Sequence, residues 1–244
     1  MKGVVYFDKY DFTSSEYTGE RDLGNAPAFS FNLALEKLEH FSSRGGLKSK
    51  DKEIISQITP GLTFTLDEVN KENLALLTMA TLNEVTQTGG NITAETHTAY
   101  EGRRINLLYR DISAVTISGY TSPADYIIDT TLKDDVIGRI YIVPAADGGT
   151  ITDGSSIDVD YTYGSITYTE VEAFNETVIE GRLRFVSDNP VGTQQELEAW
   201  RVSLTPSGDT AMIGDDWSTL GFSGEILKDT ANHPDSPYMT ITIV

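Results

Sequence analysis

Apolar and polar residues alternate along most of this chain. Large apolar side chains occupy every second position in residues 29–35 and again in residues 62–66. This period of two is typical of β-strands that bury one face. Val, Ile, Thr and Tyr are abundant in the remaining segments that resemble strands, as pleated half-buried surfaces favour. We expect these further strands at 105–109, 115–118, 138–143, 157–163, 165–172, 177–186, 200–204, 220–228 and 239–244.

Helical periodicity is limited to one short segment. Asn70 is suited to cap a helix, and Glu72 falls in its first turn, where the helix dipole favours an acid. Leu74 and Leu77 are three residues apart and are predicted to pack inward from one face. A single helical turn is also expected at 197–200.

Turn signals rich in Gly, Asp, Asn and Pro separate the strands, at 89–91, 147–149, 153–154, 188–190 and 206–209. The spacing predicts a mainly β chain: an antiparallel β-sandwich or barrel with one short flanking α-helix and a long inter-strand loop. We expect a single domain over residues 1–244, with 122–163 as a hairpin elaboration of it.

The charge of the chain is strongly negative and unevenly distributed. The net charge is −19, of which residues 1–60 contribute −1 and residues 61–244 contribute −18. Such a body repels nucleic acid and anionic membranes. The N-terminal apolar run is too short for a secretion signal, and no apolar run approaches the roughly 20 residues that span a bilayer. We therefore expect synthesis in a cytoplasm and no membrane binding.

The sequence offers little catalytic chemistry. There is no cysteine, and His40, His97 and His233 are far apart, without metal-ligand spacing. The adjacent aspartates at 134–135 and 215–216 could supply two carboxylates for glycoside hydrolysis, but such pairs are expected by chance in a chain with 37 acids. We predict no catalytic residue, no metal and no cofactor.

One basic cluster interrupts the acidic chain. Residues 44–52 contain Arg44, Lys48, Lys50 and Lys52 against a single acid. The cluster suits a solvated hairpin tip, an anion site between glycines, or a contact with the acidic surface of another copy. Only the third uses both parts of the charge asymmetry. Two different surfaces that meet in this way build rings or filaments.

Several segments together resemble the major tail tube protein of long-tailed (siphovirus-type) bacteriophages. Their order and spacing cover most of the chain, and no single segment is diagnostic. The segments are 24–25, 38–46, 64–76, 158–163, 213–217, 222–229 and 236–238.

The resemblance implies a structural virion protein. In that family an antiparallel β-sandwich with a flanking helix forms hexameric rings, and the rings stack into a non-contractile tube for genome ejection. The loop at 42–53, with its four basic residues, would reach a neighbouring ring. Implied partners are further copies of the chain, the tape measure, tail tip and tail terminator proteins, and viral DNA that passes without specific binding. The implied location is the virion tail, after synthesis in the host bacterial cytoplasm. The negative charge adds the hypothesis of an acidic conduit that repels phosphates.

Two other functions compete with this one. A monomeric β-sandwich could bind carbohydrate, or act as an adhesin-like module, if Tyr161 and Tyr163 faced outward. A glycosidase could use Asp215 or Asp216, although the resemblance places both acids in a turn before Trp217.

Overall fold

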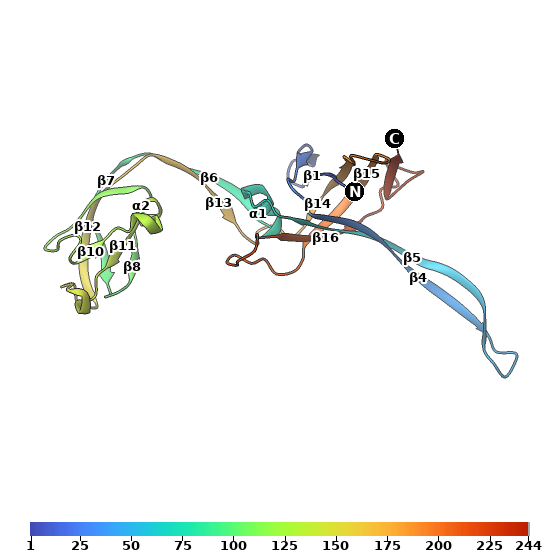
Figure 1. Ribbon diagram of the computed structural model, residues 1–244, viewed down its shortest axis with the longest axis horizontal. Coiled ribbons are helices and arrows are strands. Elements are labelled where there is room, and N and C mark those ends of the chain that lie inside the picture. Colours follow the sequence, from blue (N-terminus) through green and yellow to red (C-terminus); the bar gives the residue numbers. More distant parts are fainter. Residues whose placement is uncertain (244) are drawn as a thin grey trace. The chain divides into compact units, whose positions relative to one another are not determined.

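The computed structural model describes residues 1–243, and most of them lie in antiparallel strands. The predicted mainly β fold class is therefore confirmed. The chain divides into two compact units (Figure 1). Unit 1 consists of Met1–Asn83 with Val171–Val244, and unit 2 consists of Glu84–Glu170.

Unit 1 is built on one nine-stranded antiparallel sheet. Its strand order is β2-β1-β14-β15-β16-β5-β4, with β17 paired to β15 and β3 paired to β1. The strands are β1 (Gly3–Asp11), β2 (Glu16–Tyr17), β3 (Arg21–Asp22), β4 (Ala28–Ser42), β5 (Ser49–Leu66), β14 (Ile179–Ser187), β15 (Gln195–Pro206), β16 (Leu220–Ile226) and β17 (Met239–Ile243).

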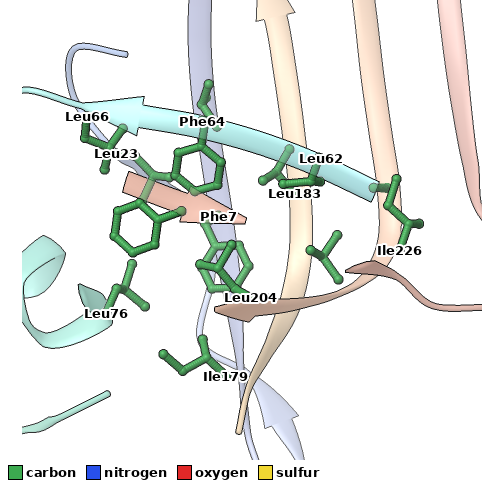
Figure 2. Packing of buried hydrophobic residues seen from close by; sticks show 14 of the residues in the cluster. Phe7, Leu23, Leu62, Phe64, Leu66, Leu76, Ile179, Leu183, Leu204 and Ile226 are labelled. Carbon is green, nitrogen blue, oxygen red and sulfur yellow. The ribbon is translucent and has the colours of Figure 1, made fainter. Parts of the chain in front are cut away.

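Alternate side chains of these strands form the core of unit 1 (Figure 2). Phe64 of β5 lies directly opposite Phe222 of β16, and their stacked rings are 5.0 Å apart. Both rings are almost fully buried, as are Leu62 and Leu204. The alternation predicted at 62–66 thus places Leu62, Phe64 and Leu66 in this core.

Helix α1 (Lys71–Leu77) covers one part of the core. Asn70 caps it as predicted, since its side chain accepts a hydrogen bond of 2.8 Å from the Asn73 amide. Leu76 is the helical leucine that enters the core, and Leu77 packs at its margin. Leu74 is half-buried and lies outside the core cluster. Asn73 fixes the rotation of the helix about its own axis. Its side chain is fully buried and donates hydrogen bonds to the carbonyl oxygens of Leu23 and Glu68.

Unit 2 has its own core between two three-stranded sheets, β10-β11-β8 and β7-β12-β9. Fully buried residues include Ile140, Ile142 and Val159. Its elements are β7 (Gly90–Ala99), β8 (Arg104–Asn106), β9 (Ile112–Ile117), β10 (Tyr126–Ile127), a 3-10 helix (Thr130–Leu132), α2 (Asp134–Ile137), β11 (Arg139–Ile142), a second 3-10 helix (Ala145–Asp147) and β12 (Ser155–Tyr163).

Two paired strands carry the chain from one unit to the other. They are β6 (Thr81–Gln87) and β13 (Ile166–Glu172), and both unit boundaries fall within them. We predicted one domain with an elaboration at 122–163. The structure instead groups all of 84–170 as a separate unit that contains this segment.

Other sequence predictions differ in detail. The helical turn expected at 197–200 was wrong, because Leu197 and Ala199 are alternate buried positions of β15. The strands β1, β6 and β7 were not predicted. The chain contains a second α-helix, α2, in addition to the single helix that we expected.

Candidate functional site

Exposed apolar side chains follow the hairpin formed by β4 and β5. This hairpin extends beyond the other strands of unit 1 (Figure 1). Leu33 lies opposite Pro60, and Leu35 lies opposite Ile58, so each pair shares one face. The exposed large apolar residues of the hairpin are Phe31, Leu33, Leu35, Leu38, Phe41, Leu47, Ile54, Ile55 and Ile58. So many exposed apolar side chains on one element are typical of a site of interaction.

The strand β4 also forms an edge of the sheet. Among the described residues it pairs with β5 alone, through all of Ala28–Ser42. The outer side of an edge strand presents unpaired N–H and C=O groups that can pair with another chain. An unsupported two-stranded hairpin is only marginally stable in water. A partner along the hairpin would stabilise it and cover its apolar side chains.

The far end of the hairpin is held by ion pairs. Lys37 Nζ lies 2.5 Å from Glu53 Oε1, and Lys50 pairs with both Glu39 and Glu53. Hydrogen bonds from Lys37 and then Lys50 lower the pKa of Glu53 to about 2. The hydrogen bonds that Lys50 donates to Glu39 and Glu53 raise the pKa of Lys50. This network joins β4 to β5 where few apolar side chains are buried.

The predicted inter-ring loop is shorter than expected. We predicted a loop over 42–53, but only residues 43–48 leave the ladder, because β5 begins at Ser49. Lys50 and Lys52 therefore lie on a strand, and Arg44 and Lys48 lie in the turn. The cross-strand charges allow pairing to continue to the end of the hairpin.

The basic residues differ in their local partners. The charge of Lys50 is offset by its two glutamates. Across residues 1–243, no carboxylate lies within 4.0 Å of the charged nitrogens of Arg44, Lys48 or Lys52. Three of the four predicted interface cations thus remain available to another molecule.

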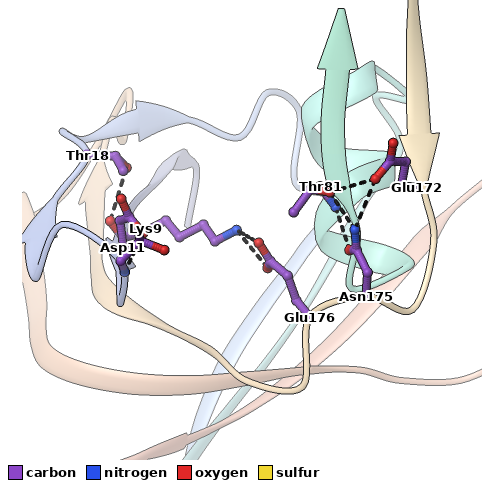
Figure 3. A network of polar contacts seen from close by, with 8 residues as sticks. Lys9, Asp11, Thr18, Thr81, Glu172, Asn175 and Glu176 are labelled. Atoms are coloured by element: carbon purple, nitrogen blue, oxygen red, sulfur yellow. Dashed lines mark hydrogen bonds and ion pairs between the residues drawn. The ribbon is translucent and has the colours of Figure 1, made fainter.

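A separate hollow of about 1010 Å³ lies in unit 1, between β1 and the segment around residue 176. Phe7 and Leu76 contribute apolar surface to it. Lys9 Nζ lies 2.7 Å from Glu176 Oε1, and the Thr81 amide donates to Asn175 Oδ1 at 2.9 Å (Figure 3). These polar groups satisfy one another and hold the walls of the hollow together.

The aromatic residues of the carbohydrate-binding alternative do not form an open platform. Tyr161 is only 2% exposed, and its hydroxyl donates to Glu95. Burial and then this hydrogen bond raise the pKa of Tyr161. Tyr163 stacks on Tyr109, with the ring centroids 3.9 Å apart. The orientation that this alternative requires is therefore absent for Tyr161.

The candidate catalytic acids lie in unrelated surroundings. Asp134 is fully buried between Arg104 and Arg139, whose nitrogens are 2.8 and 2.6 Å from its oxygens. Asp215 and Asp216 are exposed on the loop between β15 and β16. In residues 1–243 there is no cluster of three or more His, Asp or Glu that could hold a metal.

No helix in residues 1–243 is long and apolar enough to cross a membrane.

Comparison with protein families gives one match, over residues 1–242. The chain belongs to the family described as Protein of unknown function UCP028589. The match covers both unit 1 and unit 2, so both are part of the family pattern. None of the curated proteins matches the chain.

Proposed function

We propose that this chain is a structural subunit that assembles with copies of itself into a tube, as the non-contractile tail tube of a long-tailed bacteriophage. Hexameric rings of the subunit stack, and viral DNA passes through them without specific binding. The tape measure, tail tip and tail terminator proteins are its further partners in the virion tail.

The observation that carries this proposal is the exposed hairpin. Leu33 is 60% exposed, Leu38 62% and Ile54 60%, on a hairpin whose edge strand β4 pairs with no strand except β5 within residues 1–243. A soluble chain that remained a monomer would leave this surface in water, at a cost in solubility. Association of copies covers the apolar side chains and supplies partners for the backbone of β4.

The charge supports the same function. The acidic residues of the chain outnumber its basic residues by 19, and both units share the excess. A passage lined with part of this charge repels DNA phosphates, so the genome slides without adhering. The carbohydrate-binding alternative is less favoured, because Tyr161 faces the interior of unit 2.

Sedimentation velocity over a range of concentrations tests self-association of the 26.7 kDa chain. We expect the native chain to form species far larger than a monomer. The double variant Leu33→Ser and Ile58→Ser should stay monomeric with an unchanged circular dichroism spectrum, because it removes apolar contacts without touching the core. A matched control changes Leu108 and Leu132 of unit 2, which are 72% and 53% exposed, to Ser.

The control should assemble like the native chain. A native chain that remains monomeric at every concentration would contradict the proposal. So would a hairpin variant that assembles as well as its control.

A further inference from the structure

A second exposed apolar surface lies on the loop at 207–219, which joins β15 to β16. Met212 is 81% exposed, Ile213 is 96% exposed and Trp217 is 90% exposed. Isolated surface apolar residues are ordinary, but these three lie within six residues of one loop. Tryptophan is one of the residue types enriched at the energetic hot spots of protein interfaces.

This loop and the hairpin tip, defined as residues 43–52, carry opposite charge. The loop contains Asp209 and the pair at 215–216 but no Lys or Arg. The tip presents the cations of Arg44, Lys48 and Lys52, none of which has a carboxylate of residues 1–243 within 4.0 Å, together with Leu47, which is 85% exposed. Each surface combines apolar side chains with charge, and their charges are complementary. Complementarity of this kind selects partners and fixes the register of an interface.

The two surfaces lie at opposite ends of the same strand. β5 begins at Ser49, beside the tip, and ends at Leu66. Leu66 pairs with Leu220, the first residue after the loop. At about 3.3 Å per residue, the 18 residues of β5 span roughly 55 Å. The tip therefore cannot reach the loop of its own chain.

We propose that the hairpin tip of one copy docks on the 207–219 loop of a second copy. Leu47 then packs against Ile213 and Trp217, and the three free cations face the three aspartates of the loop. Because the surfaces differ and point in opposite directions along β5, the contact repeats head to tail. Such a contact extends an assembly into a filament unless the rotation between copies closes it into a ring. This inference rests on the proposed function and names the contact that would join successive copies.

Engineered disulfides test the contact directly, because the native chain has no cysteine. Leu47→Cys and Trp217→Cys are made in separate full-length chains, and one of them carries a mass tag. Mixing under mild oxidation should give a tagged–untagged dimer, with residues 47 and 217 joined in the cross-linked peptide. A disulfide requires Cα atoms about 4.4–6.8 Å apart, so only direct docking produces it efficiently. The matched control pairs Leu47→Cys with Leu108→Cys, a position of similar exposure in unit 2, and should give little mixed dimer.

Charge reversal supplies the second arm. Changing Arg44, Lys48 and Lys52 to Glu should lower the yield of the 47–217 cross-link about tenfold, as expected for the loss of three exposed ion pairs. Changing Asp209, Asp215 and Asp216 to Lys in the partner chain should restore it. Salt near 1 M should weaken the native contact, because the charges are exposed.

The outcomes separate the two proposals. Large assemblies in sedimentation without the 47–217 cross-link would overturn the docking contact and leave the proposed function standing. A chain that forms neither assemblies nor the cross-link would overturn both. Equal yields of mixed dimer from Leu47→Cys with Trp217→Cys and from Leu47→Cys with Leu108→Cys would also overturn the proposed contact.

Discussion

Buried polar residues show how single side chains organise this molecule. Asp134 is fully buried, and its two oxygens accept hydrogen bonds from Arg104 and Arg139. The hydrogen bond to Asp134 raises the pKa of Arg104. The side chain thereby ties α2 to β8 and β11, so its function is structural.

The variant Asp134→Asn should destabilise unit 2 by about 2–3 kcal/mol, because two arginines lose a charged partner. This loss of stability should be small for a buried ion pair, since both arginine side chains keep about a third of their surface in water. Unit 2 contains eight of the twelve tyrosines and neither tryptophan. Urea unfolding followed by tyrosine near-ultraviolet signal therefore reports unit 2, and tryptophan fluorescence reports unit 1.

The control for this prediction is Asp147→Asn, at an exposed acid of the same unit. It should leave both transitions unchanged. An equal shift of the tryptophan transition by Asp134→Asn would contradict the local role of this ion cluster.

Residue-level roles were predictable from sequence only where they are local. The cap at Asn70 depends on residues within one helical turn, and the structure confirms it. The entry of Leu76 into the core was not predictable, because the rotation of α1 about its axis depends on Asn73 and its hydrogen bond to the Leu23 carbonyl, 50 residues away. The sequence did not reveal the structural role of Asp134, because its partner Arg104 lies 30 residues before it.

At the scale of elements, the hairpin of β4 and β5 distinguishes this chain most clearly. Apolar pairs occupy its base, and the pairs Lys37–Glu53 and Lys50–Glu39 hold its far end. Alternation predicted both strands but placed the end of β4 too early and the start of β5 too late, because charged and polar residues replace apolar ones there. The pairing of 49–53 with β4 depends on cross-strand charges that the sequence pattern alone does not reveal.

Acid should loosen the far end of the hairpin at unusually low pH. The pKa of Glu53 is lowered from 4.5 to about 2, so its ion pairs stabilise the folded hairpin fully above about pH 4.5. This contribution is lost as the pH falls through about 2. Carbon-13 NMR of the Glu carboxyl groups, with Glu53→Gln as the assignment control, measures this titration directly.

Replacing Lys37 by Met should move the Glu53 titration back toward 4.5, because Lys37 makes the largest contribution to the shift. A Glu53 carboxyl that titrates at its ordinary value in the native chain would show that the network does not persist in solution.

At the scale of the whole molecule, the chain consists of two units with separate cores. Unit 1 carries the hairpin and the 207–219 loop, which are the two surfaces that we assign to contacts between copies. Unit 2 contains five Lys and Arg against thirteen Asp and Glu, so it adds a charge of −8. The alternation predicted the β class, whereas the division into units depends on how β6 pairs with β13, which are about 80 residues apart.

Electron microscopy of the purified full-length chain in negative stain tests the central claim most directly. Concentrated protein at low salt should show rings and hollow tubes of constant diameter, and high salt should shorten the tubes as the charged contacts are screened. A field of dispersed single-chain particles at every concentration and salt would contradict the account.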